Sequence, residues 1–170
     1  MTFNNKGLLS SDSIEWHTPD YIVKWCQDNF FISGHIFSLD VASSDLNKKA
    51  PSNYTIDDNG LIKPWFGHVW LNPPYGRTIN DWILKALKEI TKQNSNCNSI
   101  TLLIPARTDT RWWFSLVNNK IKKNIIFIKG RIKFSGKAAA PFPSVIVHLL
   151  PSKGETTVSF QEIPKPPRRV

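Results

Sequence analysis

The sequence predicts a single α/β domain in which helices cover both faces of a mostly parallel sheet. Short, continuous apolar runs alternate along the chain with segments whose apolar residues recur at helical spacing. Continuous apolar strands are typical of sheets buried on both faces, and their alternation with amphipathic helices is typical of parallel α/β folds. The chain has 170 residues, of which 41% are hydrophobic and 21% charged. This size and composition are those of one globular domain.

Three segments have the pattern of amphipathic helices. Pro19 stands where the first helix should begin, and Asn80 or Asp81 can cap the second. A third helix is expected with Asp109 or Thr110 at its start. The expected helices cover residues 20–31, about 80–92 and about 109–119.

The expected strands are short apolar runs that end at prolines or turn residues. The first carries Asp40 near its end, and the second stops directly before Asn72. Between them, residues 42–67 show only a weak, turn-rich pattern. Because ligands bind at the carboxyl ends of parallel strands, Asp40 and Asn72 are expected near a ligand. The expected strands lie at 36–41, 68–71, 99–104, 124–128 and 144–150, with an edge strand at 156–160.

No internal repeat or domain boundary is visible, so residues 1–163 are expected to form one domain with a loose segment at 1–15. The tail, 164–170, has three prolines and three basic residues and is expected to be mobile. There is no signal-peptide pattern and no apolar run near the roughly 18 residues of a transmembrane helix. A cytoplasmic protein without a membrane partner is therefore expected. Cys26 and Cys97 are expected to be reduced thiols, and no metal site is expected.

The net charge of +9 favours a polyanionic partner, through long-range attraction and counterion release. The basic residues gather late in the chain and suggest one basic face. They are Lys120, Lys122, Lys123, Lys129, Arg131, Lys133, Lys137, Lys165, Arg168 and Arg169. Charge supports a nucleic-acid partner without deciding the matter.

The most informative segment is Asn72-Pro73-Pro74-Tyr75, which directly follows an expected buried strand. A rigid strand-ending turn with Tyr75 in the core would explain these residues structurally, but their place at a strand's carboxyl end favours a catalytic loop. The exocyclic nitrogen of adenine is a poor nucleophile, because its lone pair is delocalised into the ring. The side-chain oxygen of Asn72 and the carbonyl oxygen of Pro73 could accept hydrogen bonds from its two N–H groups and free that lone pair.

The other residues of this loop fit the same chemistry. Prolines fix φ near −65° and remove competing donors, so the Pro73 carbonyl would be held in place before the substrate arrives. Tyr75 offers a flat face to an extruded base, a contact worth about 1–3 kcal/mol. Methyl transfer from a sulfonium needs in-line alignment more than acid–base help. A base inside a duplex must be flipped out to be reached, which fits a basic surface.

Six segments, in this order along the chain, resemble the motifs of the phage-type DNA N-6-adenine-methyltransferase (Dam) family. They are Trp16-His17-Thr18-Pro19, Leu39-Asp40-Val41-Ala42-Ser43, Asp58-Asn59-Gly60-Leu61 ahead of Trp65, the Asn72-Pro73-Pro74-Tyr75 loop, 103–110 with Trp113-Phe114, and Gly130-Arg131-Ile132-Lys133-Phe134. The resemblance implies a Rossmann-like methyltransferase fold, S-adenosyl-L-methionine as methyl donor and double-stranded DNA as substrate. It also implies a protein of a bacterial host or a phage.

The resemblance further implies which residues bind the cofactor. Each has a structural alternative: Thr18 can cap a helix with Trp16 as a staple, Asp40 can cap its own loop, and Asp57 or Asp58 can simply form a turn. The usual glycine-rich loop is absent, and Ala42-Ser43-Ser44 stands in its place. The expected cofactor residues are Trp16, Thr18, Pro19, Asp40, Ala42, Ser43 and Asp58.

DNA contacts are expected at the later motifs, where a solvated charged face is the ordinary alternative. Arg107 and its neighbours could contact the cofactor, the flipped base or the DNA backbone, and Trp112 and Trp113 are expected in the core. With a chain of this size, specificity should come from loops at 105–118 and 130–143 and be short or loose. A monomer is expected. The expected DNA-binding residues are Arg107, Lys129, Arg131, Lys133 and Phe134.

Other classes fit the sequence less well. Neither Cys26 nor Cys97 follows a proline, as the nucleophile of a cytosine-C5 enzyme normally does. Asn72 and Tyr75 favour adenine over cytosine N4, where Ser and Trp are more usual at these positions. Protein-glutamine and RNA methyltransferases share Asn-Pro-Pro-Tyr but usually keep a glycine-rich cofactor loop. An inactive DNA-binding relative remains the alternative from another class.

Overall fold

The computed structural model describes residues 17–134 and 139–165, which form one seven-stranded sheet and three helices. The helices are α1 (Asp20–Phe30), α2 (Ile79–Thr91) and α3 (Arg111–Val117). The strands are β1 (Leu39–Asp40), β2 (Ser52–Asn53), β3 (Gly67–Leu71), β4 (Cys97–Pro105), β5 (Ile121–Ile128), β6 (Ser144–Lys153) and β7 (Thr156–Gln161). Within these residues, no helix is long and apolar enough to span a bilayer.

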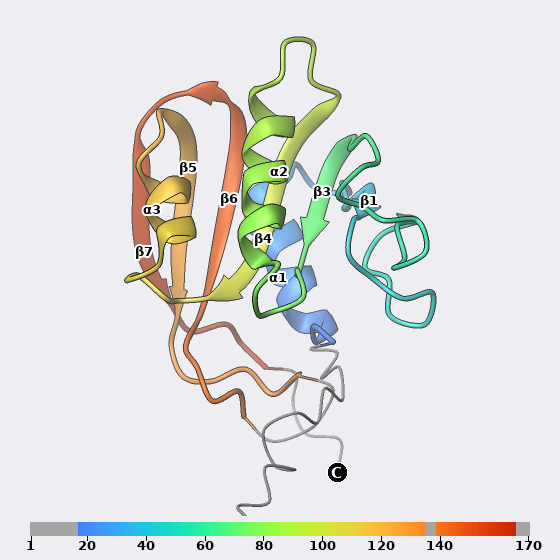
Figure 1. Cartoon of the computed structure of the whole chain (residues 1–170). Coiled ribbons are helices and arrows are strands. Elements are labelled where there is room, and N and C mark those ends of the chain that lie inside the picture. The colour runs from blue at the N-terminus through green and yellow to red at the C-terminus, as the bar shows by residue number, and fades with distance from the viewer. Residues whose placement is uncertain (1–16, 135–138, 166–170) are drawn as a thin grey trace, which may run out of the picture.

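The strand order in the sheet is β2-β1-β3-β4-β6-β5-β7. β2, β1, β3 and β4 are parallel to one another, and β5 is parallel to β7. α2 and α3 cover one face and α1 covers the other (Figure 1). The expected mostly parallel sheet with helices on both faces is thus confirmed. The exception is β6, which lies antiparallel between β4 and β5, because the chain returns from β5 at the same edge and needs no crossover.

The two faces of the sheet are sorted by the period-two alternation of strand side chains. In β3, Val69 and Leu71 pack with α2 and α3, whereas Trp70 packs with α1. Trp112 and Trp113 of α3 are buried in the first of these clusters, which confirms that they belong to the core.

Three local expectations differ from the structure. β1 is shorter than the expected 36–41, and β2 was not expected, because its two polar residues form a strand only by pairing with β1. Neither Asn80 nor Asp81 caps α2: Thr78 precedes the helix without a side-chain cap, and Asp81 lies in the first turn. There the carboxylate of Asp81 still favours the helix through its dipole. Thr110 does cap α3, since its hydroxyl accepts from the Trp113 backbone N–H at 3.3 Å.

Two histidines fasten the end of α1 to the sheet. His148 of β6 stacks on Phe30 with ring centroids 4.2 Å apart, and its Nδ1 lies 2.9 Å from Thr101 Oγ1. His68 of β3 packs at the same distance, 4.2 Å, against Phe31. His148 is 2% exposed. Burial, together with the nearby His68, lowers its pKa to about 4, so the neutral ring is the form that the fold accommodates.

We predict that His148 makes the fold sensitive to acid. In the unfolded chain it binds a proton below its ordinary pKa near 6.5, but in the folded chain only near 4. The stabilisation is therefore complete above pH 6.5 and is lost as the pH falls toward 4, by on the order of 3 kcal/mol. Urea unfolding at pH 7.5 and pH 5 should show a smaller pH effect in His148→Phe than in the unsubstituted protein.

The matched control for this prediction is Thr101→Val, which removes the hydrogen-bond partner of His148 but keeps the imidazole. Its unfolding should stay pH-dependent. Asp40, whose pKa is raised to about 6 by burial, acts in the opposite direction and is common to all three proteins. An unchanged pH dependence in His148→Phe would show that other groups carry the acid sensitivity.

Candidate active site

Three parallel strands, β1, β3 and β4, end at the same edge of the sheet. β1 ends at Asp40 and lies in register with β3, which ends just before Asn72. β4 lies on the other side of β3 and ends at Pro105. In Figure 1 the arrowheads of β3 and β4 point to this same edge. The expectation that Asp40 and Asn72 share the ligand-binding edge of the sheet agrees with this register.

The side-chain amide of Asn72 is held at both of its ends. Its Nδ2 donates to Thr18 Oγ1 at 3.1 Å, and its Oδ1 accepts from the Tyr75 hydroxyl at 2.8 Å. Pro73 is buried and Pro74 is exposed. Thr18 and Asn72 are 54 positions apart in sequence, so their contact is a product of the fold.

Tyr75 is fixed by contacts around its ring and its hydroxyl. Phe142 and Phe134 approach the ring edge-on, with centroids 5.2 Å and 6.4 Å away. The hydroxyl also lies 3.4 Å from the carbonyl oxygen of Leu103 in β4. Burial raises the pKa of Tyr75, so the hydroxyl keeps its proton and remains a donor.

Thr18 does not have the capping role that the sequence left open. The residue that precedes α1 is Pro19, and no side chain caps the helix. Thr18 is 3% exposed, and its hydroxyl bonds to Asn72 instead. Trp16, expected beside them, lies outside the described residues.

The loop after β1 closes on Asp40. The carboxylate accepts from the backbone N–H of Lys49 at 3.0 Å and of Ala42 at 3.3 Å, which is the local capping role considered for it. Asp40 is 2% exposed, and burial raises its pKa to about 6 against the opposing effect of these two bonds. The Ser43 hydroxyl oxygen is buried and makes no hydrogen bond within the described chain.

A second loop, which contains Asp58 and Gly60, packs against the end of β1. Asp58 accepts from the N–H and the hydroxyl of Thr55 at 2.9 Å and 3.0 Å, so its carboxylate stabilises a turn. Gly60 passes so close to Val41 that an added Cβ would lie 2.2 Å from the Val41 carbonyl oxygen. Trp65 Nε1 donates to the Gly60 carbonyl at 2.8 Å. These contacts hold the loop against the β1 end, beside Ala42 and Ser43.

This neighbourhood fits the expected cofactor, S-adenosyl-L-methionine. The Ser43 hydroxyl is buried and makes no hydrogen bond to the residues that the structure describes, so a ligand could supply its partner. Asp40 and Asp58 both have local structural roles. Direct cofactor contacts by these residues stay predictions.

The expected DNA-binding residues divide into two groups. Arg107, Arg131 and Lys133 are exposed, and Lys129 is exposed but paired with Glu162 at 2.9 Å. Phe134 differs from its expectation: it is 1% exposed and packs on Tyr75. In this structure the Phe134 ring supports Tyr75, and a contact of Phe134 with a DNA base stays a prediction. Phe142, on the other side of Tyr75, was missed by sequence reasoning, and only its place between two prolines marks it in the sequence.

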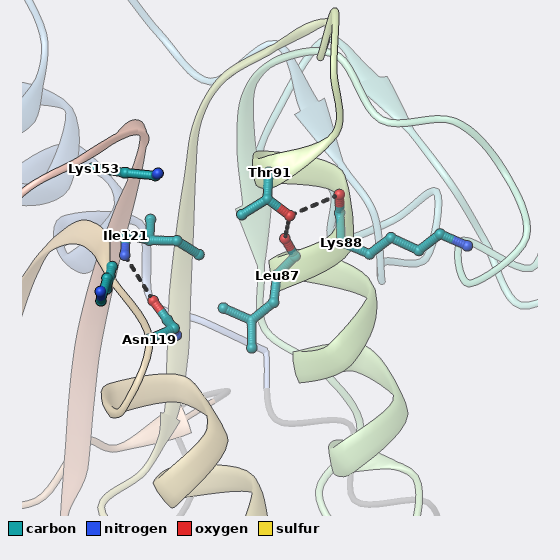
Figure 2. Close-up of a pocket in the computed structure, with 7 residues that line it drawn as sticks. Leu87, Lys88, Thr91, Asn119, Ile121 and Lys153 are labelled. Carbon is teal, nitrogen blue, oxygen red and sulfur yellow. Dashed lines mark hydrogen bonds between the residues drawn. The ribbon is translucent and has the colours of Figure 1, made fainter.

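A separate cavity of about 400 Å³ lies far from this edge (Figure 2). It opens where α2 ends and β5 begins, which is the amino edge of the parallel strands. Its walls are mainly apolar and include Leu87 and Ile121. None of the residues expected at the active site lines it.

The fold defines an α/β protein with a mostly parallel sheet, and Asp40 and the Asn72 loop both lie at the carboxyl edge of that sheet. A family model described as DNA N-6-adenine-methyltransferase (Dam) matches residues 7–156. The chain belongs to this family. A curated protein of Escherichia phage T1, "DNA N-6-adenine-methyltransferase", is 32% identical over 113 residues, which are 64% of this chain and 43% of that protein. The match thus spans less than half of the relative's length.

One solved structure is also similar, that of a predicted O-methyltransferase from Agrobacterium tumefaciens. The sequences are 22% identical, the likeness covers 62% of this chain and 45% of that one, and the TM-score is 0.35. That score is too low to bear on the fold, which rests on the strand order and on family membership.

We predict that Gly60→Ala lowers the free energy of unfolding by about 1–3 kcal/mol, the usual cost of overpacking. The new Cβ would collide with the backbone carbonyl of Val41, which cannot move aside as a side chain can. Gly154→Ala is the control, because its Cβ would meet only the Lys122 side chain, at 3.0 Å. Urea unfolding measures both. Equal losses in the two variants would mean that the loop is not pinned at Gly60.

Proposed function

We propose that the protein transfers a methyl group from S-adenosyl-L-methionine to N6 of an adenine flipped out of double-stranded DNA. The observation that carries the proposal is the Asn72 amide, held at a strand's carboxyl end with its nitrogen on Thr18 and its oxygen on Tyr75. Family membership supports the same activity. The phage relative is more than twice as long as the matched segment. The proposal for this chain therefore rests on the chain's own site and not on the activity of that relative.

The chemistry begins with the target amine. Asn72 Oδ1 would accept one of its N–H groups and the Pro73 carbonyl oxygen the other, which draws the nitrogen toward tetrahedral geometry and frees its lone pair. An amide that is already fixed makes such an acceptor effective, because it needs no reorganisation when charge develops on the nitrogen. Bound S-adenosyl-L-methionine supplies the electrophilic methyl group, and the protein's contribution is to align the amine with it.

The rest of the site supports the base and the duplex. The Tyr75 ring is held by T-shaped contacts with Phe134 and Phe142, so the orientation of the ring on which the base would stack is fixed before the base arrives. The exposed Arg107, Arg131 and Lys133 would contact phosphates around the extruded nucleotide. No proton has to be stored by the protein, since the amine loses its proton after the methyl group has been transferred.

The proposal is tested by the product of the reaction. The protein is incubated with methyl-labelled S-adenosyl-L-methionine and duplex DNA, and the DNA is digested to nucleosides. The label should appear in N6-methyladenine. Label in N4-methylcytosine or in protein alone would refute the adenine assignment. Absence of S-adenosyl-L-methionine binding at millimolar concentration would favour an inactive DNA-binding relative.

We predict that Asn72→Ala keeps the fold and cofactor binding but loses at least ~100-fold in turnover, the scale for removing one preorganised hydrogen-bonding group from an active site. Steady-state rates and calorimetric titration of the cofactor measure the two effects separately. The matched control is Asn119→Ala, whose amide bonds to local backbone groups, with Nδ2 donating to two carbonyls of α3 and Oδ1 accepting from the Ile121 N–H, and its turnover should be unchanged. Near-normal turnover of Asn72→Ala would mean that the active site lies elsewhere.

A further inference from the structure

Thr18 forms a hydrogen bond with Asn72 that its position before a helix does not predict. A threonine just before a helix ordinarily caps it, but the residue at the start of α1 is Pro19 and no side chain caps the helix. The Thr18 hydroxyl instead accepts from Asn72 Nδ2 at 3.1 Å, and Thr18 is 3% exposed. A buried hydroxyl directed at the amide of the proposed catalytic residue is placed to orient that amide.

The oxygen of the same amide accepts a hydrogen bond from a second residue, Tyr75. The Tyr75 hydroxyl donates to Asn72 Oδ1 at 2.8 Å, the atom that the target amine would need. This hydroxyl has one proton, and a second acceptor, the Leu103 carbonyl oxygen, lies 3.4 Å from it. The Tyr75 hydroxyl can therefore donate to either acceptor and still make a hydrogen bond when it leaves Asn72 Oδ1.

We infer that Thr18 is a positioning residue, whose hydroxyl holds the Asn72 amide nitrogen while the Tyr75 hydroxyl yields the amide oxygen to the target amine and turns to Leu103. The inference rests on the proposed function. The Thr18 contact lies on the nitrogen side, so it persists when the oxygen changes partners. It thereby restrains the position of the amide while the oxygen changes partners.

The inference differs from a direct cofactor contact by Thr18, which family resemblance favours. A cofactor contact would act on the binding of S-adenosyl-L-methionine. A positioning contact acts on the chemical step after both substrates are bound. The two roles therefore separate in the dissociation constant of the cofactor and in kcat.

The experiment compares Thr18→Val, which keeps the shape and removes the hydroxyl, with Thr18→Ser, which restores it. For Thr18→Val we expect kcat for N6-methyladenine to fall three- to tenfold, the range that one neutral hydrogen bond supplies. The calorimetric dissociation constant of S-adenosyl-L-methionine should stay within twofold. Thr18→Ser should recover kcat to within twofold of the unsubstituted protein.

Thr101→Val is the matched control. Thr101 is also buried and its hydroxyl also bonds to a side chain, that of His148, but it lies away from the strand ends. Its loss should lower stability without lowering kcat. If Thr18→Val does not fold, Thr18→Ala carries the same expectations, since it also removes the hydroxyl and relieves any crowding.

A second readout does not depend on activity. The side-chain amide of Asn72, identified in ¹H–¹⁵N spectra by its absence in Asn72→Ala, should shift in Thr18→Val and return in Thr18→Ser. Weaker cofactor binding with unchanged kcat, unchanged values of both, or a failure of Thr18→Ser to recover kcat would each overturn the inference. An unsubstituted protein that makes no N6-methyladenine overturns the proposed function instead, and the amide spectrum then still reports whether Thr18 holds Asn72.

Discussion

The amide of Asn72, bonded to Thr18 on one side and to Tyr75 on the other, is the interaction on which the site depends. Each partner reaches it from a different part of the fold. Thr18 comes from the segment that leads into α1, and the far end of α1 packs on the sheet through the contacts of Phe30 and Phe31 with two histidines. Tyr75 is fixed because the connection between β5 and β6 supplies Phe134 and Phe142 to its ring. The fold thus serves to bring distant segments to one side chain.

The groups in this arrangement are neutral, which has a physical consequence. The Tyr75 hydroxyl keeps its proton because burial raises its pKa, and neither an asparagine amide nor a threonine hydroxyl ionises. A partly buried network of neutral hydrogen bonds avoids the cost of burying charge. Positioning rather than proton storage is then the contribution such a site can make to methyl transfer.

How far the sequence predicts this molecule depends on the range of the interactions involved. The helices and most strands follow from local periodicity, and Asn72-Pro73-Pro74-Tyr75 stands out because prolines and a polar residue end a buried strand. β2 has no periodic signal of its own and exists only through pairing with β1. The bond from Thr18 to Asn72 joins residues 54 positions apart, and no local pattern reports such a contact. The packing of Phe134 on Tyr75 was not predicted either, because the basic residues beside Phe134 directed the interpretation of this segment to DNA contacts.

The segment around Phe134 shows how the basic surface is joined to the site. Arg131 and Lys133 are exposed, whereas Ile132 and Phe134 between and after them are 1% exposed. This alternation is that of an extended chain with one face on the core. The backbone is held there by a hydrogen bond from the Ala140 N–H to the Ile132 carbonyl at 2.9 Å. A polyanion that bound Arg131 and Lys133 would therefore contact the same segment that supports Tyr75. Under the proposed function, contact with the duplex and alignment of the base would therefore depend on the same stretch of backbone.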